Sequence, residues 1–232
     1  MEYILLVQST RGVPPREEIV MAEMQKYSAE LAQAGQLRGG APLHPDAQGA
    51  RVRVTGSRAT VLDGPFTETK ELLGGFFLLE ARDREQALEI AKRCPAARSA
   101  YVELHGVMRE VKLANARGTR FMLLFWQSEL NNDPDGSKVA EMDRWLEPLK
   151  RDGVYVECGG LLDDPKPARV ERRGARATVL DGPFTETKEV LGGYMVALLP
   201  DRAAAIALAK QCPHATWGTV EVREIMSVPA PS

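Results

Sequence analysis

Residues 58–71 read RATVLDGPFTETKE, and residues 176–189 read RATVLDGPFTETKE a second time. The two stretches lie 118 residues apart, which is close to half of the 232-residue chain. From Arg58 to Gly75, 17 of 18 positions equal their partners from Arg176 to Gly193. A repeat of this size predicts two copies of one small domain, packed together as an internal pseudo-dimer. We expect the first copy to span residues 1–114 and the second copy residues 119–232.

The charge balance limits the partners of this chain. With 30 basic and 32 acidic side chains the formal net charge is −2. The sequence therefore lacks the basic footprint of proteins that bind nucleic acid or anionic lipid. The longest apolar runs, such as Phe121–Trp126, are too short to span a bilayer. We expect a soluble protein that contacts neither nucleic acid nor membrane.

The N-terminus and the cysteines indicate a compartment. The opening residues MEYILLV carry an acid at position 2 and do not read as a signal peptide. The three cysteines show no paired spacing, which argues against a disulfide framework or a zinc site. A reducing cytoplasm is the expected location.

Each copy predicts the same order of elements. A short apolar strand is followed by a helix with one apolar stripe, ended by Gly35 in the first copy and by Gly153 in the second. Pro148, inside the second of these helices, should kink or shorten it. A polar loop (residues 39–49 and 159–167) leads to a hairpin closed around Gly56–Ser57.

The DGPF turn follows the hairpin, and we expect one short helical turn over Thr67–Leu73. A second core strand (76–80), a second helix (84–93) and a closing strand (101–108, with 219–226 in the second copy) complete the unit. The order β-α-β-β-α-β with an extra hairpin is typical of the ferredoxin-like α+β fold. Helices would cover one face of an antiparallel sheet, and the sheet of the sister copy is the natural cover for the other face.

The stretches Asp63-Gly64-Pro65-Phe66 and Asp181-Gly182-Pro183-Phe184, each followed by Thr-Glu-Thr-Lys-Glu, resemble the YCII-related family and more closely its DGPF-motif branch. The resemblance covers nearly the whole chain twice. It implies two ferredoxin-like units packed as an intramolecular dimeric α/β barrel, with a cavity between two sheets that lie face to face. It also implies a role that is largely unassigned.

The chain departs from one feature that the family suggests, a His–Asp pair with the histidine on the first helix. Neither expected first helix, 16–34 or 138–150, contains a histidine. The three histidines are His44, His105 and His214, and none is duplicated at the 118-residue offset. A symmetric site built on a histidine base is therefore not expected.

Asp63 and Asp181 have two interpretations. A carboxylate that faces a partly apolar cleft can have a raised pKa and act as a general base or a ligand anchor. Alternatively, an Asp before Gly-Pro is good turn chemistry, because its side chain accepts nearby backbone N–H groups.

The charged segment after the motif is equally ambiguous. Lys70 and Glu71, with their copies Lys188 and Glu189, could line the polar mouth of a cavity. They could also belong to a helix start capped by Thr67 and surrounded by solvent.

Glu103 and Glu221 lie in the closing strands, where alternation predicts one buried face. A buried glutamate is costly unless it is paired, so each either faces solvent or has a lysine or arginine partner. Phe66 and Phe184 are interpreted as core residues rather than as stacking platforms for a ligand.

The sequence contains no phosphate-binding glycine loop and no Gly-x-Ser-x-Gly, His-Glu-x-x-His or Cys-x-x-Cys. We therefore expect no cofactor and no metal. The leading interpretation is a module that binds a small metabolite between the two sheets. Its candidate ligand-binding residues are Asp63, Asp181, Lys70, Lys188, Glu103 and Glu221.

Two alternatives remain open. One is a cofactor-free enzyme with an Asp base, such as an isomerase, hydrolase or monooxygenase, by analogy with other dimeric barrels. The other is a regulatory interaction protein, because the resemblance implies a link to extracytoplasmic-function sigma factors. An exposed apolar patch instead of a cavity would favour the latter.

Overall fold

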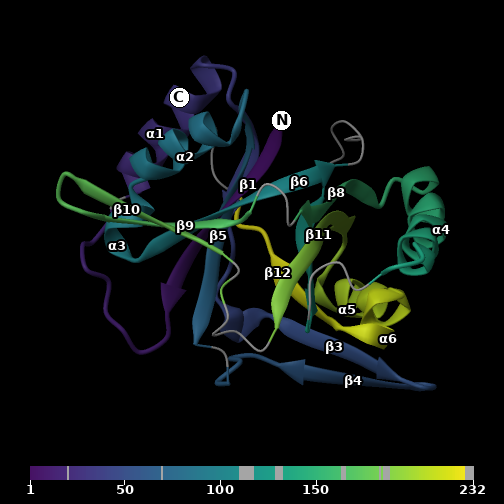
Figure 1. Ribbon diagram of the computed structural model, residues 1–232. Coiled ribbons are helices and arrows are strands. Elements are labelled where there is room, and N and C mark those ends of the chain that lie inside the picture. The colour runs from purple at the N-terminus through teal and green to yellow at the C-terminus, as the bar shows by residue number, and fades with distance from the viewer. Residues whose placement is uncertain are drawn as a thin grey trace.

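The computed structural model describes residues 1–19, 21–68, 70–109, 118–128, 133–162, 166–182, 184 and 189–227. It is a mixed α+β structure with a large antiparallel sheet and a few helices (Figure 1). The elements of the first half are β1 (Glu2–Thr10), α1 (Met21–Gln33), β2 (Leu37–Pro42), the 3₁₀ turn η1 (Asp46–Gln48), β3 (Ala50–Thr55), β4 (Arg58–Asp63), β5 (Glu71–Glu80), α2 (Arg84–Arg93), α3 (Ala96–Ser99) and β6 (Tyr101–Arg109). Those of the second half are β7 (Thr119–Gln127), α4 (Ser137–Arg151), β8 (Tyr155–Leu162), β9 (Ala168–Arg173), β10 (Arg176–Asp181), β11 (Val190–Leu199), α5 (Arg202–Gln211), α6 (His214–Trp217) and β12 (Thr219–Glu224).

Each half contains a four-stranded antiparallel sheet with the strand order of a ferredoxin-like unit. The order is β2-β5-β1-β6 in the first half and β8-β11-β7-β12 in the second. The polar stretches expected to be loops are in part the strands β2 and β8, because their backbones pair with β5 and β11. These are the strands that complete each unit, and the hairpins are insertions between β2 and β5 and between β8 and β11.

Two further sequence expectations are corrected. The residues after the DGPF motif do not form a helical turn: Thr67 and Glu68 form a turn, and β5 begins at Glu71, which pairs with Thr10 of β1. Sheet pairing there overrides the local helix-start pattern. Pro148 does not shorten α4, which continues to Arg151; it lies in the last turns, and its carbonyl accepts the N–H of Asp152 at 2.9 Å.

The two halves exchange their hairpins. In the first half, β3 leaves its own sheet and pairs with β12, and in the second half β9 pairs with β6. Helices α5 and α6 contact β3, and α2 and α3 contact β9, so each hairpin is also held by the helices of the opposite half (Figure 1). The antiparallel sheet of each half is thus extended by two strands that belong to the other half.

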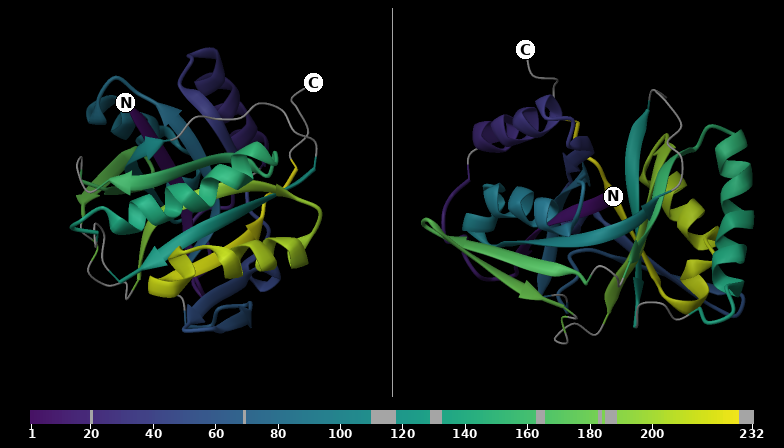
Figure 2. Two further views of the ribbon diagram at one scale, coloured as in Figure 1. Left: turned by 90° about the vertical axis from the view of Figure 1, so that its right-hand side faces the viewer. Right: turned by 45° about the horizontal axis from the view of Figure 1, so that its top comes forward.

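The helices lie on the two outer sides of the molecule, with the strands between them (Figure 2). One cluster of buried residues lies beneath α1 and α2 and includes Tyr27 and Leu31, and a second lies beneath α4 and α5. A third cluster joins the opposite faces of the two sheets, with Leu6 of β1 and Leu124 of β7 among its members. The sister sheet is therefore the cover for the face that the helices leave open.

The strands of the two halves also pair at their edges. Residues 106–109 of β6 pair with residues 159–162 of β8. At the pseudo-equivalent place, a single β-bridge joins Leu43, just after β2, to Ile225, just after β12. These contacts connect the two four-stranded sheets on both sides.

The DGPF turn of the first half packs against the η1 turn. The N–H of Gly64 donates to the carbonyl of Gly49 at 3.1 Å, and the Gly64–Pro65 peptide bond is cis. The N–H of Phe66 donates to Oδ2 of Asp46 at 3.1 Å. A Cβ on Gly64 would lie 1.9 Å from the carbonyl oxygen of Asp46, so only glycine fits this contact.

We expect Gly64→Ala to lower the free energy of unfolding by about 1–3 kcal/mol, because the backbone must move to make room for the methyl group. Gly74→Ala is the matched control, because a Cβ there meets nothing closer than Val7 O at 3.8 Å. Urea unfolding of both variants checks this. Equal stability losses at the two positions would contradict the close packing of the DGPF turn.

Candidate functional site

The exchanged hairpins place one arginine opposite a buried glutamate in each half. Arg51 of β3 faces Glu221 of β12, and Arg169 of β9 faces Glu103 of β6, each as direct cross-strand partners. Arg51 donates to Glu221 at 2.9 and 2.8 Å, and Arg169 donates to Glu103 at 3.1 and 2.7 Å. Glu221 is 3% and Glu103 is 7% exposed. Of the two sequence alternatives for these glutamates, pairing with a basic side chain is the one found.

The phenylalanines of the DGPF motifs lie under the same two arginines. The guanidinium of Arg51 lies 4.5 Å from the ring centre of Phe66, and that of Arg169 lies 4.7 Å from that of Phe184. Arg169 also lies 4.2 Å from the ring centre of Tyr101. Phe66 is therefore both a buried core residue and a platform for a guanidinium of this chain, and the cation–π contacts fix the arginines in place.

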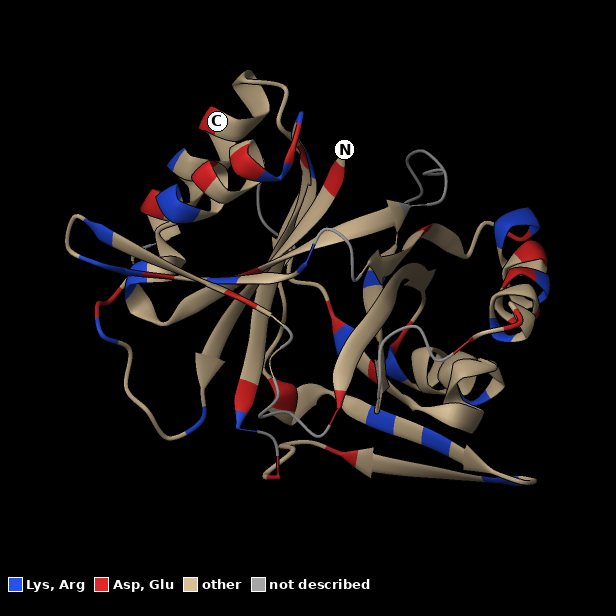
Figure 3. Cartoon of the chain, in the orientation of Figure 1, with Lys and Arg blue, Asp and Glu red and all other residues tan. Residues whose placement is uncertain are grey.

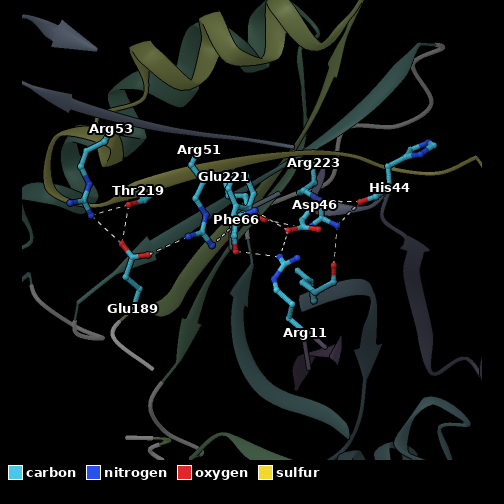
Figure 4. A network of polar contacts seen from close by, with 11 residues as sticks. Arg11, His44, Asp46, Arg51, Arg53, Phe66, Glu189, Thr219, Glu221 and Arg223 are labelled. Carbon is cyan, nitrogen blue, oxygen red and sulfur yellow. Dashed lines mark hydrogen bonds and ion pairs between the residues drawn. The ribbon is translucent and has the colours of Figure 1, made fainter. Parts of the chain in front are cut away.

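Each buried glutamate has one further neighbour on its own strand, and the two neighbours differ. Arg223 donates from Nη1 to Glu221 at 3.2 Å and holds the backbone carbonyl of His44 through Nε at 3.0 Å (Figure 4). The equivalent residue beside Glu103 is His105, whose Nε2 lies 3.6 Å from Oε2, an electrostatic contact rather than a hydrogen bond.

Burial opposes ionisation of Glu103 and is the largest single influence on its pKa. His105 and Arg169 together outweigh it and hold the pKa of Glu103 below its ordinary value of 4.5.

Burial also acts against ionisation of Asp46, the carboxylate at the η1 turn. The hydrogen bonds from Arg11 and from the N–H of Phe66 outweigh it and lower the pKa of Asp46.

Asp63 and Asp181 lie at the surface and not on the wall of the large cavity described below. Asp63 forms an ion pair with Arg202 at 2.5 Å, and Asp181 forms one with Arg84. Both arginines open a helix of the opposite half, α5 and α2. The side chain of Asp63 is 71% and that of Asp181 is 59% exposed. The observed partner of each carboxylate is thus an arginine of the other half.

A central cavity of about 1180 Å³ opens between the halves beside both arginines. Much of its wall is formed by the end of β1 and the segment after it (residues 9–16), by residues 70–72 and by residues 99–101. Its charged lining residues are Arg11, Arg16, Arg51, Lys70, Arg169, Glu68, Glu71, Glu171 and Glu189. Both signs of charge are therefore present, as they are over the molecule as a whole (Figure 3).

The structure brings some of the predicted residues together. Lys70 lies on the wall of the central cavity with Glu71 and Glu189. Glu103 and Glu221 are not among the lining residues of the cavity, but they bind Arg169 and Arg51, which are. The predicted residue Lys188 lies outside the described residues.

Two residues of the cavity wall, Tyr101 and Trp126, have a buried polar side-chain atom without a hydrogen bond among the described residues: the hydroxyl of Tyr101 and Nε1 of Trp126. Tyr101 is 6% exposed and lines the cavity. Among the described residues its buried hydroxyl makes no hydrogen bond of normal length and geometry, although the Glu71 carboxylate is close enough to interact with it. Burial and then the nearby charge of Glu71 raise the pKa of this hydroxyl, so it stays protonated.

Sequence reasoning missed Arg51, Arg169 and Tyr101. The signal for the arginines was the duplicated Ala-Arg-Val at 50–52 and 168–170, in a strand where the valines point to the core and the arginine to the other face. No repeat marks Tyr101, because its equivalent is Thr219.

The described part of the chain contains no group of three or more His, Cys, Asp or Glu side chains arranged to hold a metal ion. None of the helices in the described ranges is long and apolar enough to cross a membrane.

Comparison with known proteins matches the chain to a family model, to a curated protein and, more remotely, to a solved structure. The model of the YCII-related domain matches residues 1–111 and again residues 119–229. An uncharacterised protein of Rhizobium meliloti (strain 1021) is 36% identical over 76 residues, which are 33% of this chain and 61% of that relative. The chain thus spans less than two thirds of that relative's length. A crystal structure of a chlorite dismutase-like protein aligns over 97% of this chain and 94% of that one, with a TM-score of 0.39 and 8% identity, too distant to bear on function.

We expect Glu221→Gln to lower the free energy of unfolding by about 3 kcal/mol, because it leaves two arginines beside a neutral, buried partner. Asp63→Asn should change it by less than about 1 kcal/mol, since an exposed ion pair contributes little. Urea unfolding of the two variants measures both values. A larger loss for Asp63→Asn than for Glu221→Gln would contradict the assignment of the structural role to the buried glutamate.

Stability should fall as the pH is lowered below about 4.5, and Glu103 should contribute to the fall. Its pKa is lower in the folded chain than in the unfolded chain, so on acidification the unfolded state binds a proton first. The contribution is complete above the ordinary pKa and is lost as the pH falls through the folded value. Urea unfolding between pH 7 and acid should show a shallower dependence for Glu103→Gln than for the wild type; identical slopes would refute it.

Proposed function

The chain belongs to the YCII-related family, and we propose that this tandem member binds one small organic molecule in the central cavity. The observation that carries the proposal is the buried hydroxyl of Tyr101 on the cavity wall, which makes no hydrogen bond of normal geometry among the described residues. A buried hydroxyl without a hydrogen bond costs free energy, which a bound ligand would recover.

We also propose that the halves form an intramolecular dimeric α/β barrel and that the chain belongs to the DGPF branch of the family. Two features support the barrel: the pairing of β6 with β8, and the bridge from Leu43 to Ile225 on the other side. The third buried cluster, between the sheets, supports it as well. The DGPF assignment is supported by the duplicated motif.

The cavity, at about 1180 Å³, is somewhat larger than most small-molecule sites, and its lining has the mixed chemistry of such a site. Ligand sites commonly have volumes of about 300–1000 Å³ with a few polar groups among apolar ones. Here Tyr101 and Trp126 supply aromatic surface, and Arg169 and Glu71 supply charge at fixed positions. The cross-strand ion pairs hold these charged side chains in place, so the site is formed before a ligand binds.

The alternative of an enzyme with an Asp base finds no support at Asp63 or Asp181. Both carboxylates are paired with arginines at the surface, and neither lies on the wall of the central cavity.

The test uses the chain's own asymmetry. Ser99 lines the central cavity, and its equivalent in the second half is Trp217. We expect Ser99→Trp to fill part of the cavity and to abolish ligand binding. Ser57→Trp, in the exposed turn between β3 and β4, is the control.

A metabolite library is screened by thermal shift and native mass spectrometry. At least one compound should stabilise the wild type and Ser57→Trp, by about 2.7 kcal/mol at 100 times its Kd, and should leave Ser99→Trp unchanged. A library without any such compound, or a compound that stabilises all three proteins equally, would contradict the proposal.

A further inference from the structure

The two halves contain equivalent polar sites, and the site of the second half is complete. Arg53 donates from Nη2 to Oε1 of Glu189 at 3.0 Å and to Oγ1 of Thr219 at 2.9 Å (Figure 4). Thr219 donates its own hydroxyl to Glu189 at 2.9 Å. One guanidinium of the chain thus satisfies both a carboxylate and a hydroxyl. These three residues line or adjoin a smaller hollow of about 390 Å³.

The equivalent site of the first half lacks that guanidinium. At the 118-residue offset, Glu189 corresponds to Glu71, Thr219 to Tyr101, and Arg53 to Glu171. An anion stands where the second half has a cation, and the hydroxyl of Tyr101 is buried without a hydrogen bond of normal geometry among the described residues. All three residues line the central cavity. The first half therefore keeps a carboxylate and a hydroxyl where Arg53 binds in the second half, and the guanidinium that contacts this carboxylate is that of Arg169.

The arginines on the cavity wall are already matched by carboxylates. Arg11 pairs with Asp46, Arg16 with Glu171, Arg51 with Glu221, and Arg169 with Glu103 and Glu71. An anionic ligand would compete with these pairs for each guanidinium. Glu71 shares Arg169 with Glu103, so part of its capacity to accept hydrogen bonds is available to an N–H donor.

We propose that the first-half site binds a small organic cation of the guanidine or amine class, between Glu71, Glu171 and the hydroxyl of Tyr101. This inference rests on the proposed function and names its ligand chemistry. The N–H groups of the cation donate to the Glu71 carboxylate and to the Tyr101 oxygen, as Arg53 does to Glu189 and Thr219. One cation binds per chain, because Arg53 fills the second site.

The experiment is an NMR chemical-shift titration of the full chain, which detects weak binding of small fragments. The probe is N-ethylguanidinium, the head of an arginine side chain, and the neutral control is N-ethylurea, which has nearly the same shape. Propionate tests the anionic class. We expect saturable 1:1 binding of N-ethylguanidinium, and no saturation with N-ethylurea or propionate.

Three variants locate the site. Tyr101→Phe should weaken binding of the probe about tenfold, the effect of losing one hydrogen bond. Glu171→Arg, which restores the residue found at position 53, should abolish binding, and Glu171→Gln should weaken it without adding bulk. Thr219→Val, the matched loss of a hydroxyl in the second half, should leave the affinity unchanged.

The inference is overturned if N-ethylguanidinium does not bind, if N-ethylurea or propionate binds as well as it does, or if Tyr101→Phe and Glu171→Arg bind it like the wild type. Such a result would contradict the choice of a cation but not the proposed binding of a small molecule in the cavity. A neutral or anionic metabolite that stabilises the wild type but not Ser99→Trp would keep the cavity as a binding site and reject the cation alone.

Discussion

Each half of the chain buries a glutamate in its closing strand and pairs it with an arginine that the other half supplies. An isolated carboxylate at 3% or 7% exposure would be strongly unfavourable. The exchange of hairpins therefore satisfies an electrostatic requirement as well as extending each sheet. Since Arg51 serves Glu221 and Arg169 serves Glu103, the requirement is reciprocal, and neither half is complete alone. The aromatic platforms Phe66 and Phe184 come from the DGPF motifs, which links the repeated motif to this pair.

The buried Arg–Glu ion pairs are the same in both halves, whereas the residues around them differ. Beside the buried glutamates, Arg223 of the second half corresponds to His105, and at the edge of the cavity Arg53 corresponds to Glu171. The second site is satisfied by its own side chains, and the first opens into the larger cavity. A duplicated scaffold thus carries one site that is filled from within and one that can receive a molecule, which is the physical basis for one ligand per chain.

Much of the fold follows from the sequence. The duplication predicts two similar units, and the apolar stripe with Gly35 predicts α1 and its end. The strand β2 was not predicted because Leu37–Pro42 reads LRGGAP, in which small residues and a proline give no strand pattern, and pairing with β5 makes these residues a strand. The destination of the hairpins could not be predicted, because alternation identifies the buried face of β3 but not the edge strand that it joins. Asp63 was a candidate site residue because it is a repeated acid. Its ion-pair partner Arg202 lies 139 residues away, and no local sequence pattern identifies Arg202 as that partner.

The central claim is that the glutamate of one half is neutralised by the arginine of the other, and a double-mutant cycle on Glu103 and Arg169 tests it most directly. Urea unfolding is measured for Glu103→Gln, Arg169→Gln and the double variant, with Glu103→Gln and Arg202→Gln as the control pair. The account predicts a coupling energy of at least about 1.5 kcal/mol between Glu103 and Arg169, as for other close charge pairs, and additive effects for the control. Additive effects of Glu103→Gln and Arg169→Gln would contradict it.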